Sequence, residues 1–180
     1  MPSFFNCYIV PMIILGIDTA LRCTGYGVID FSTSDRIKVL DCGVIKTKAS
    51  ARHSECLRRL AGGMRELVEK YHPQAAAIES AFFQKNIKTA MILSYARGAV
   101  MTVFAENDIP IYAYAPRKAK QSVCGNGAAS KEQVAFLLAG RLGLNIKEMP
   151  LDSSDALALA ICHGQIATSP MAEHLLQDMI

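Results

Sequence analysis

The sequence has 180 residues, of which 51% are hydrophobic and 19% are charged, and this composition excludes an intrinsically disordered chain. The length corresponds to one domain with a sizeable hydrophobic core. A net charge of +3 permits a nucleic-acid partner without requiring one, because the distribution of charge matters more than its sum.

The first eleven residues are apolar, but they lack the lysine or arginine with which a secretory signal begins. Pro11 also interrupts the apolar run before it is long enough to span a membrane. We therefore expect no targeting or membrane segment, and we interpret residues 1–11 as an N-terminal extension, with Met12 as an alternative start. The six cysteines form no C-x-x-C pair and no zinc-ligand spacing, which is typical of reduced core thiols in a cytoplasmic protein.

Three strands are predicted before the first helix. Residues 13–18 form a short apolar run rich in β-branched side chains, which is typical of a buried strand. Residues 25–29 lead into a polar turn at 32–35, and residues 36–47 alternate imperfectly between apolar and polar. Because only short turns join these segments, we expect an antiparallel meander.

The middle of the chain alternates between helix and strand. Apolar side chains recur at helical spacing over residues 50–71, and Pro73 ends that helix. A short apolar strand over 75–80, a long apolar helix over 87–106 and a strand over 109–114 follow. This alternation predicts parallel strands joined by helical crossovers.

The last third is predicted to be helical. A short basic helix over 116–123 is followed by a glycine-containing loop, a helix that begins at Ser130 and a last helix over about 152–166. The whole chain is thus expected to be α/β, with a five-stranded mixed sheet of three antiparallel and then two parallel strands, flanked by helices. We place one domain at residues 12–167 and a loose C-terminal tail at 168–180.

Four acidic residues interrupt apolar stretches. Asp18 closes the first strand, Glu79 closes the fourth, and Asp152 and Asp155 lie one turn apart at the start of the last helix. A solvated strand end or a helix N-cap would explain each acid taken alone. Neither explains the apolar residues after Asp155, which direct the same helix against the sheet.

These acids are expected to converge at one edge of the sheet. Parallel strands end at the same edge, so Asp18 and Glu79 would face one cleft. Four carboxylates at short range raise one another's pKa values and oppose folding. Two divalent cations would balance that charge, and oxygen ligands suit Mg²⁺ or Mn²⁺. Such a pair clamps the oxygens of a phosphoryl displacement, which predicts metal-assisted hydrolysis.

Four segments in this order resemble the RuvC family of Holliday-junction resolvases: ILGIDTALRCTGYGVI, AAAIESAFFQKN, YAPRKAKQSVCGNGAASKEQV and DSSDALALAICH. The resemblance covers residues 12–164. It implies a ribonuclease-H-like fold, a homodimer, and symmetric nicking of a four-way DNA junction in recombination and repair that leaves 5′-phosphates. It also implies a RuvA/RuvB-type branch-migration helicase complex as a partner. The family's catalytic acids, which bind two Mg²⁺ per active site, fall on Asp18, Glu79, Asp152 and Asp155.

The resemblance further implies residues that contact DNA. Phe82 matches an aromatic that disturbs base stacking at the junction centre, and the alternative is that Phe82 or Phe83 belongs to the core. Lys120 and Lys131 match basic residues beside the scissile phosphate. Other cations would widen this positive surface, unless they form an ordinary solvated face. They are Lys85, Lys88, Arg117 and Lys118.

One motif departs from the family, which usually has Asp-Pro-Gly where this chain has Asp18, Thr19 and Ala20. The acid is retained but the chemistry of a tight turn is lost. Two other functions stay open. The run Gly16, Ile17 and Asp18 followed by a small-residue turn also opens the phosphate loops of ATP-binding domains of the sugar-kinase and actin-like class, although that class usually needs a glycine-rich phosphate turn and a longer chain. The lost turn suggests the other function, a junction-binding module without catalytic activity.

Two further features have alternative interpretations. The helix over 87–106 is apolar on more than one face and carries small residues such as Gly98, so it either packs on its own sheet or forms a dimer contact. His163 follows Asp152 by eleven residues, about 16 Å along a helix, which is too far to share the same metals.

Overall fold

The computed structural model of the chain describes residues 11–80, 86–147, 149–170, 172 and 180. The predicted extension, apart from Pro11, and most of the predicted tail lie outside these residues. No helix within the described part is long and apolar enough to cross a membrane. The elements are, in chain order, β1 (Met12–Asp18), β2 (Cys23–Thr33), β3 (Arg36–Lys46), α1 (His53–Tyr71), β4 (Ala75–Glu79), α2 (Ile87–Ala105), β5 (Ile111–Tyr114), α3 (Pro116–Cys124), α4 (Lys131–Leu142) and α5 (Leu151–Ala167).

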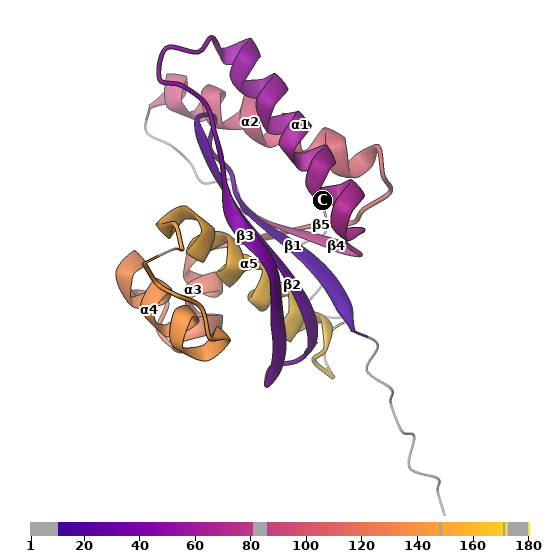
Figure 1. Cartoon of the computed structure of the whole chain (residues 1–180), viewed down its shortest axis with the longest axis vertical. Helices are drawn as coiled ribbons and strands as arrows, with labels where there is room; N and C mark the ends of the chain where they lie inside the picture. Colours follow the sequence, from indigo (N-terminus) through magenta and orange to yellow (C-terminus); the bar gives the residue numbers. More distant parts are fainter. Residues whose placement is uncertain (1–10, 81–85, 148, 171, 173–179) are drawn as a thin grey trace, which may run out of the picture.

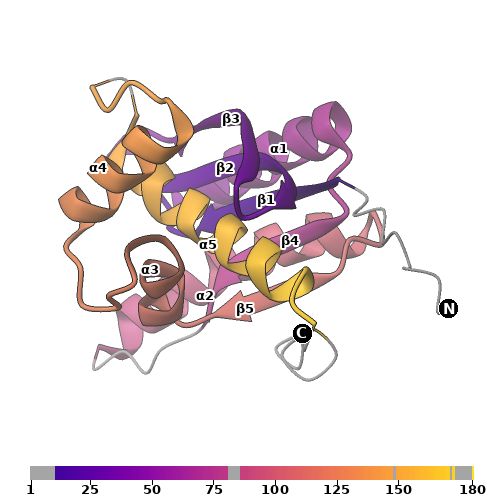
Figure 2. The same ribbon diagram turned by 90° about the horizontal axis from the view of Figure 1, so that it is seen from below.

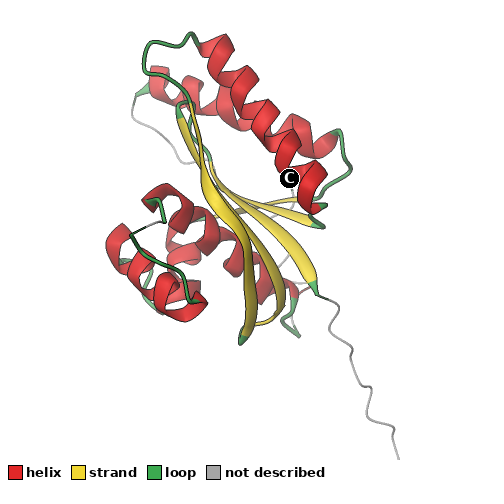
Figure 3. Ribbon diagram, in the orientation of Figure 1, coloured by secondary structure: helices red, strands yellow, loops and turns green. Residues whose placement is uncertain are grey.

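The five strands form one sheet (Figure 3). Their order across the sheet is β3-β2-β1-β4-β5. The pairs β1–β2 and β2–β3 are antiparallel, as the short turns between these strands require. The pairs β1–β4 and β4–β5 are parallel, and α1 and α2 provide the crossovers. The predicted mixed sheet is therefore confirmed, with the three antiparallel strands before the two parallel ones.

Several element ends differ from the sequence prediction. β2 is longer than the predicted 25–29, because it pairs with β1 on one side and β3 on the other along its length. β5 begins at Ile111 rather than residue 109, because the Ile109 amide bonds the Phe104 carbonyl and completes the end of α2. α1 begins only at His53, because Arg52 is its N-cap. The Glu55 carboxylate accepts a hydrogen bond from the Arg52 backbone amide at 2.9 Å.

Helices cover both faces of the sheet, with α1 and α2 on one side and α3, α4 and α5 on the other (Figures 1 and 2). Alternate residues of each strand enter the two resulting cores. In β1, for example, Leu15 and Ile17 pack on the side of α1 and α2, whereas Ile14 packs on the side of α5. The even-numbered residues of β1 therefore face α5.

α5 is buried along nearly its whole length, because the sheet covers one side of it and α3 and α4 cover the other. Glycines in the sheet allow its backbone to approach closely. A Cβ atom at Gly16 would lie 2.0 Å from the Ala156 carbonyl oxygen, and one at Gly25 would lie 2.0 Å from the Asp152 carbonyl oxygen. The start of α5 is thus fixed against the ends of β1 and β2.

We predict that Gly16→Ala destabilises the fold strongly, by about 3 kcal/mol or more, because its methyl group would overlap the α5 backbone. Gly62→Ala in α1 is the matched control, since a Cβ there meets no atom within 4 Å. The control should gain about 0.5–1 kcal/mol from helix propensity. Urea unfolding of both variants measures the two changes, and equal stability of the two would contradict the close packing of α5.

Candidate active site

Two of the predicted acids lie side by side at the ends of parallel strands. Asp18 is the last residue of β1 and Glu79 is the last residue of β4. Ile17 and Ile78, the residues before them, are paired in the parallel register. Both acids follow the alternation that directs Ile14 and Ala77 toward α5, so both face that helix.

The other two acids lie in the first turns of α5. The N-cap of this helix is Pro150, and the hydroxyls of Ser153 and Ser154 bond carbonyl oxygens of the preceding turn. The explanation of Asp152 as an N-cap is therefore wrong. Because neither Asp152 nor Asp155 is used to cap the helix, their carboxylates are free for other contacts: Asp155 lines the pocket at the sheet edge, and Asp152 lies 3.9 Å from Lys131 beside it.

A pocket of about 180 Å³ opens where these elements meet. Asp18, Glu79 and Asp155 line it, together with Lys120 and Lys131. Its remaining walls are apolar and come from α3 and α5: Pro116, Ala119, Ala158 and Leu159. Acids that are up to 137 residues apart in the sequence thus share one small cavity, whereas Asp152, the fourth predicted acid, is not among the residues that line it.

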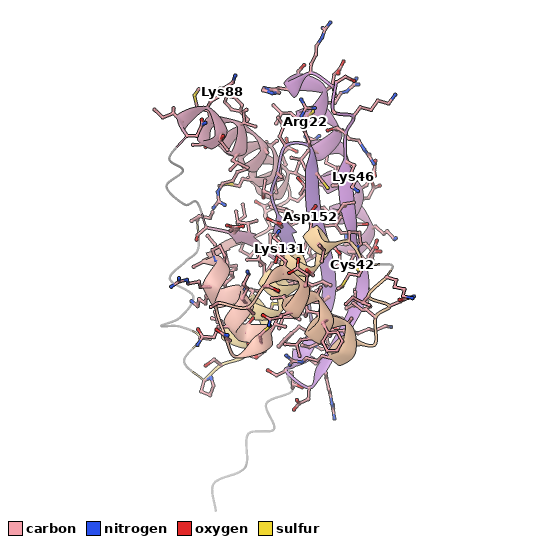
Figure 4. The ribbon with its side chains drawn as sticks, turned by 90° about the vertical axis from the view of Figure 1, so that its left-hand side faces the viewer. Arg22, Cys42, Lys46, Lys88, Lys131 and Asp152 are labelled. Carbon is pink, nitrogen blue, oxygen red and sulfur yellow. The ribbon has the colours of Figure 1, made fainter. Side chains whose placement is uncertain are left out.

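Lys131, the first residue of α4, inserts its ammonium group among the acids. Its Nζ lies 2.5 Å from Asp155 Oδ2, 3.9 Å from Asp18 Oδ2 and 3.9 Å from Asp152 Oδ1. Lys131 and Asp152 also lie close together in Figure 4. The sequence predicted that Lys131 contacts a phosphate, whereas here the same ammonium is a counter-ion for three carboxylates.

The pKa values show that one lysine does not balance the negative charge. Burial, followed by the charge of Asp155, raises the pKa of Asp18 from 3.8 to about 7, although Lys131 acts in the opposite direction. Burial and then Asp155 likewise raise the pKa of Glu79. Burial lowers the pKa of Lys131, but its hydrogen bond and charge interaction with Asp155 act in the opposite direction, and the pKa is raised overall. The pocket therefore favours additional positive charge.

The donor set fits a hard divalent cation such as Mg²⁺ or Mn²⁺, because it consists of carboxylate oxygens. The elevated pKa of Asp18 supports the fit, since a bound cation would offset the charge that burial disfavours. Within the described residues, no three His, Cys, Asp or Glu side chains form a group that could hold a metal ion. Three of the acids are grouped about Lys131 instead. Metal binding stays a prediction.

Two neighbours of the acids were not predicted from the sequence. The thiol of Cys23, at the start of β2, donates a hydrogen bond to Asp152 Oδ2 at 3.1 Å. Arg97 of α2 donates to the backbone carbonyl of Glu79. No sequence signal indicates Cys23. Arg97 is the one charge between Lys88 and Glu106 in an otherwise apolar segment, and that isolation could have marked it.

The remaining predicted DNA-contacting residues are dispersed. Lys120 lines the pocket and donates to the Ala129 carbonyl at 2.9 Å. Lys118 of the same helix lies over the Tyr114 ring, with Nζ 5.4 Å from its centroid, and Arg117 is exposed to solvent. Lys88 is exposed in the first turn of α2. Other predicted residues lie outside the described part of the chain. They are Phe82, Phe83 and Lys85.

His163 does not line the pocket, in agreement with its predicted distance from the metals. It is buried and forms a hydrogen bond of 2.7 Å with the Tyr114 hydroxyl, while its ring stacks on Tyr112. Burial lowers the pKa of His163 to about 4, so the ring is neutral at pH 7. Its contacts join the second half of α5 to β5.

Comparisons with known proteins agree with this geometry. A family model described as "Crossover junction endodeoxyribonuclease RuvC" matches residues 14–163. The protein of that name from Chlorobaculum parvum is 44% identical over 151 residues, which make up 84% of this chain and 80% of the relative.

Solved structures give the same result. T. thermophilus RuvC in complex with a Holliday junction substrate has a TM-score of 0.80 and 33% identity, over 87% of this chain and 94% of that chain. Another Thermus thermophilus RuvC structure has a TM-score of 0.78 and 30% identity, over 94% of this chain and 100% of that one. These likenesses confirm the predicted resemblance and the ribonuclease-H-like fold.

We predict that Asp18→Asn stabilises the metal-free protein at high pH. The folded pKa of about 7 exceeds the usual 3.8, so folded Asp18 holds its proton between these values and unfolded Asp18 does not. Its contribution to the unfolding free energy is thus present below pH 4 and is lost as the pH rises through 7. The variant should match the wild type near pH 4 and exceed it at pH 8 by on the order of 3 kcal/mol.

Urea unfolding in EDTA across this range measures the difference between the two proteins. The lowered pKa of His163 makes the unfolding free energy rise with pH between about pH 4 and 6.5, which is opposite to the effect of Asp18. Both proteins share this contribution, so it cancels in the difference between them. A difference that does not change with pH would contradict the buried state of Asp18.

Proposed function

Because the chain belongs to the RuvC family of crossover junction endodeoxyribonucleases, we propose that it nicks four-way DNA junctions by metal-assisted hydrolysis. The observation that carries this proposal is the single pocket in which Asp18, Glu79 and Asp155 meet two lysines. The related T. thermophilus protein has been solved with a Holliday junction substrate, which supports the same substrate class for this chain.

The four acids are proposed to hold two Mg²⁺ or Mn²⁺ ions. Asp18 would bind one ion with Asp155 or Asp152, and Glu79 would bind or orient the second. Such ions, when bound, supply an activated water and stabilise the leaving 3′-oxygen. The apolar wall formed by Ala158 and Leu159 excludes bulk water from one side of the pocket and thereby strengthens the electrostatic interactions within it.

The lysines are proposed to act on the phosphate. Lys120 and Lys131 both line the pocket, so a phosphate that entered it would meet two ammonium groups. Lys131 would then exchange carboxylate contacts for phosphate contacts. Arg97 donates a hydrogen bond to the Glu79 carbonyl and so holds the end of β4, where the alternation of the strand directs that acid toward the pocket. Hydrolysis in this geometry is proposed to leave 5′-phosphates that a ligase can seal.

Other parts of the proposal concern the wider DNA surface and the partners. Arg117 and Lys118 lie on the same helix as Lys120 and would contact the phosphate backbone beyond the pocket. The wedge function of Phe82 and the phosphate contact of Lys85 stay predictions. A cytoplasmic location and a RuvA/RuvB-type branch-migration complex also stay predictions.

One of the two alternative functions is disfavoured, and the other needs an experimental test. Membership of the RuvC family argues against the ATP-binding class, and the turn after Asp18 still has no glycine-rich phosphate loop. A junction-binding module without activity is a closer alternative, because it shares the fold and the DNA surface. Cleavage of a synthetic junction distinguishes it from a nuclease.

We predict that Asp18→Asn, Glu79→Gln and Asp155→Asn each lower the rate of junction cleavage in Mg²⁺ by at least about 100-fold. Junction binding in EDTA should be retained or strengthened, because each substitution removes a negative charge near the phosphates. Cleavage of a fluorescent four-way junction measures the rate, and a gel shift measures binding.

The matched control is Asp35→Asn, an exposed acid in the turn between β2 and β3, which should leave cleavage unchanged. A linear duplex of the same sequence tests selectivity for the junction, and sealing of the nicks by DNA ligase tests for 5′-phosphates. A wild-type protein that binds the junction and never cuts it would support the inactive binding module instead.

A homodimer is proposed through the first half of α2. The second half of this helix is buried in its own domain through Ala96, Val100, Val103 and Phe104, so the packing alternative holds for that half. In the first half, however, Ile87, Met91 and Tyr95 are 77%, 50% and 46% exposed at helical spacing. A symmetric second copy would cover this stripe, and paired nicks require one active site for each strand.

We predict that Met91→Glu combined with Tyr95→Glu converts the dimer to a monomer, because it places charges in the apolar contact. Phe136→Glu is the control, since Phe136 of α4 is 69% exposed and lies outside α2. Analytical ultracentrifugation measures the mass. A wild-type monomer at micromolar concentration, or dissociation by the control alone, would overturn the assignment of this face.

A further inference from the structure

The turn after Asp18 lacks the Pro-Gly pair that the family usually has. It joins β1 to β2 through residues 19–22. Among the described residues other than glycine, positive φ angles occur at His72 and Asp108 alone, so Thr19 and Ala20 have ordinary backbone angles. Glycine is therefore not required here, and another interaction must hold the turn.

The side chain of Thr24 supplies that interaction. Its hydroxyl accepts a hydrogen bond from the Ala20 amide at 3.2 Å and donates one to the Ala20 carbonyl. Thr24 is fully buried, with 0% of its surface exposed, so water does not compete for these bonds. The far end of the turn is held separately, because the Thr47 amide donates to the Arg22 carbonyl at 3.0 Å.

The turn lies between contacts that set the positions of two catalytic acids. Asp18, at its start, is paired with Gly25 across β1 and β2. Gly25 follows Thr24 and contacts the backbone of Asp152. A change in the turn would therefore shift Asp18 directly and Asp152 through Gly25.

We propose that Thr24 is a positioning residue of the active site, which holds Asp18 and Asp152 in register by binding both backbone groups of Ala20. This inference rests on the proposed function for its catalytic consequence. It concerns the carboxylates before any DNA is bound, so it can be tested without cleavage. A merely structural role would change stability and leave the affinity for metal ions unchanged.

The first test is Thr24→Val, which keeps the shape of the side chain and removes the hydroxyl. Amide hydrogen exchange at Ala20 should accelerate, and the affinity for Mn²⁺, measured by calorimetry without DNA, should fall by roughly 10-fold. Thr24→Ser retains the hydroxyl and should restore both values. Thr47→Val is the matched control, because it changes a threonine near the other end of the turn, whose backbone bond remains.

A second variant keeps the proposal testable if Thr24→Val folds poorly. Thr19→Pro with Ala20→Gly introduces the turn that the family usually has, which should be rigid without help from Thr24. In this background Thr24→Val should lower Mn²⁺ affinity by less than 3-fold, compared with roughly 10-fold in the natural turn. Circular dichroism and thermal melting confirm the folded state of each variant.

The outcomes separate this inference from the proposed function. Unchanged Ala20 exchange and unchanged Mn²⁺ affinity in Thr24→Val, or equal losses in Thr24→Ser, would overturn the positioning role even if the protein cuts junctions. Failure of the wild type to cut junctions would overturn the proposed function alone, because accelerated Ala20 exchange with weaker Mn²⁺ binding would still support the role of Thr24.

Discussion

The contact between the backbone of α5 and the sheet determines where the acids of this protein lie. Gly16 and Gly25 have no side chains, and the carbonyl groups of Ala156 and Asp152 occupy the space that a Cβ would fill. Because both contacts involve backbone atoms, α5 has little freedom to slide or to rotate. The acids at its start are therefore held beside the ends of β1 and β4.

This packing has an electrostatic cost. It buries Asp18 and brings it close to Asp155, and these two effects raise the Asp18 pKa to about 7. Lys131 compensates in part, through its contacts with three carboxylates. Clusters of like charge that oppose folding are characteristic of sites that bind cations or carry out proton chemistry. The same residues thus lower the stability of the metal-free protein, and in the proposed function they would attract divalent ions.

The helices on the two faces of the sheet differ in how fully the rest of the chain covers them. α5 lies between the sheet and α3 and α4, so its apolar residues on all sides are satisfied within one chain. α2 has a similar composition, but only its second half is covered. Its stripe from Ile87 to Tyr95 is exposed, whereas α5 is buried along nearly its whole length. The similar composition of the two helices does not reveal this difference.

The sequence by itself determined the order of the strands and helices and the mixed sheet, and it predicted a site of four acids, of which Asp18, Glu79 and Asp155 line one pocket. Hydrophobic periodicity and short turns are local signals, so they can be read from neighbouring residues. The acids could be selected because each of them interrupts an apolar run. The resemblance to the RuvC family, carried by four motifs, then pointed to one common site.

Only the tertiary structure decided how the site is assembled. The position of Lys131 among the acids, the bond from Cys23 to Asp152 and the bonds from Thr24 to Ala20 depend on side-chain directions at the meeting of separate elements. The first two contacts join residues 24 and 129 positions apart, and no local pattern encodes them. Even the short contact at Ala20 depends on a turn whose shape is set by the pairing of β1 with β2.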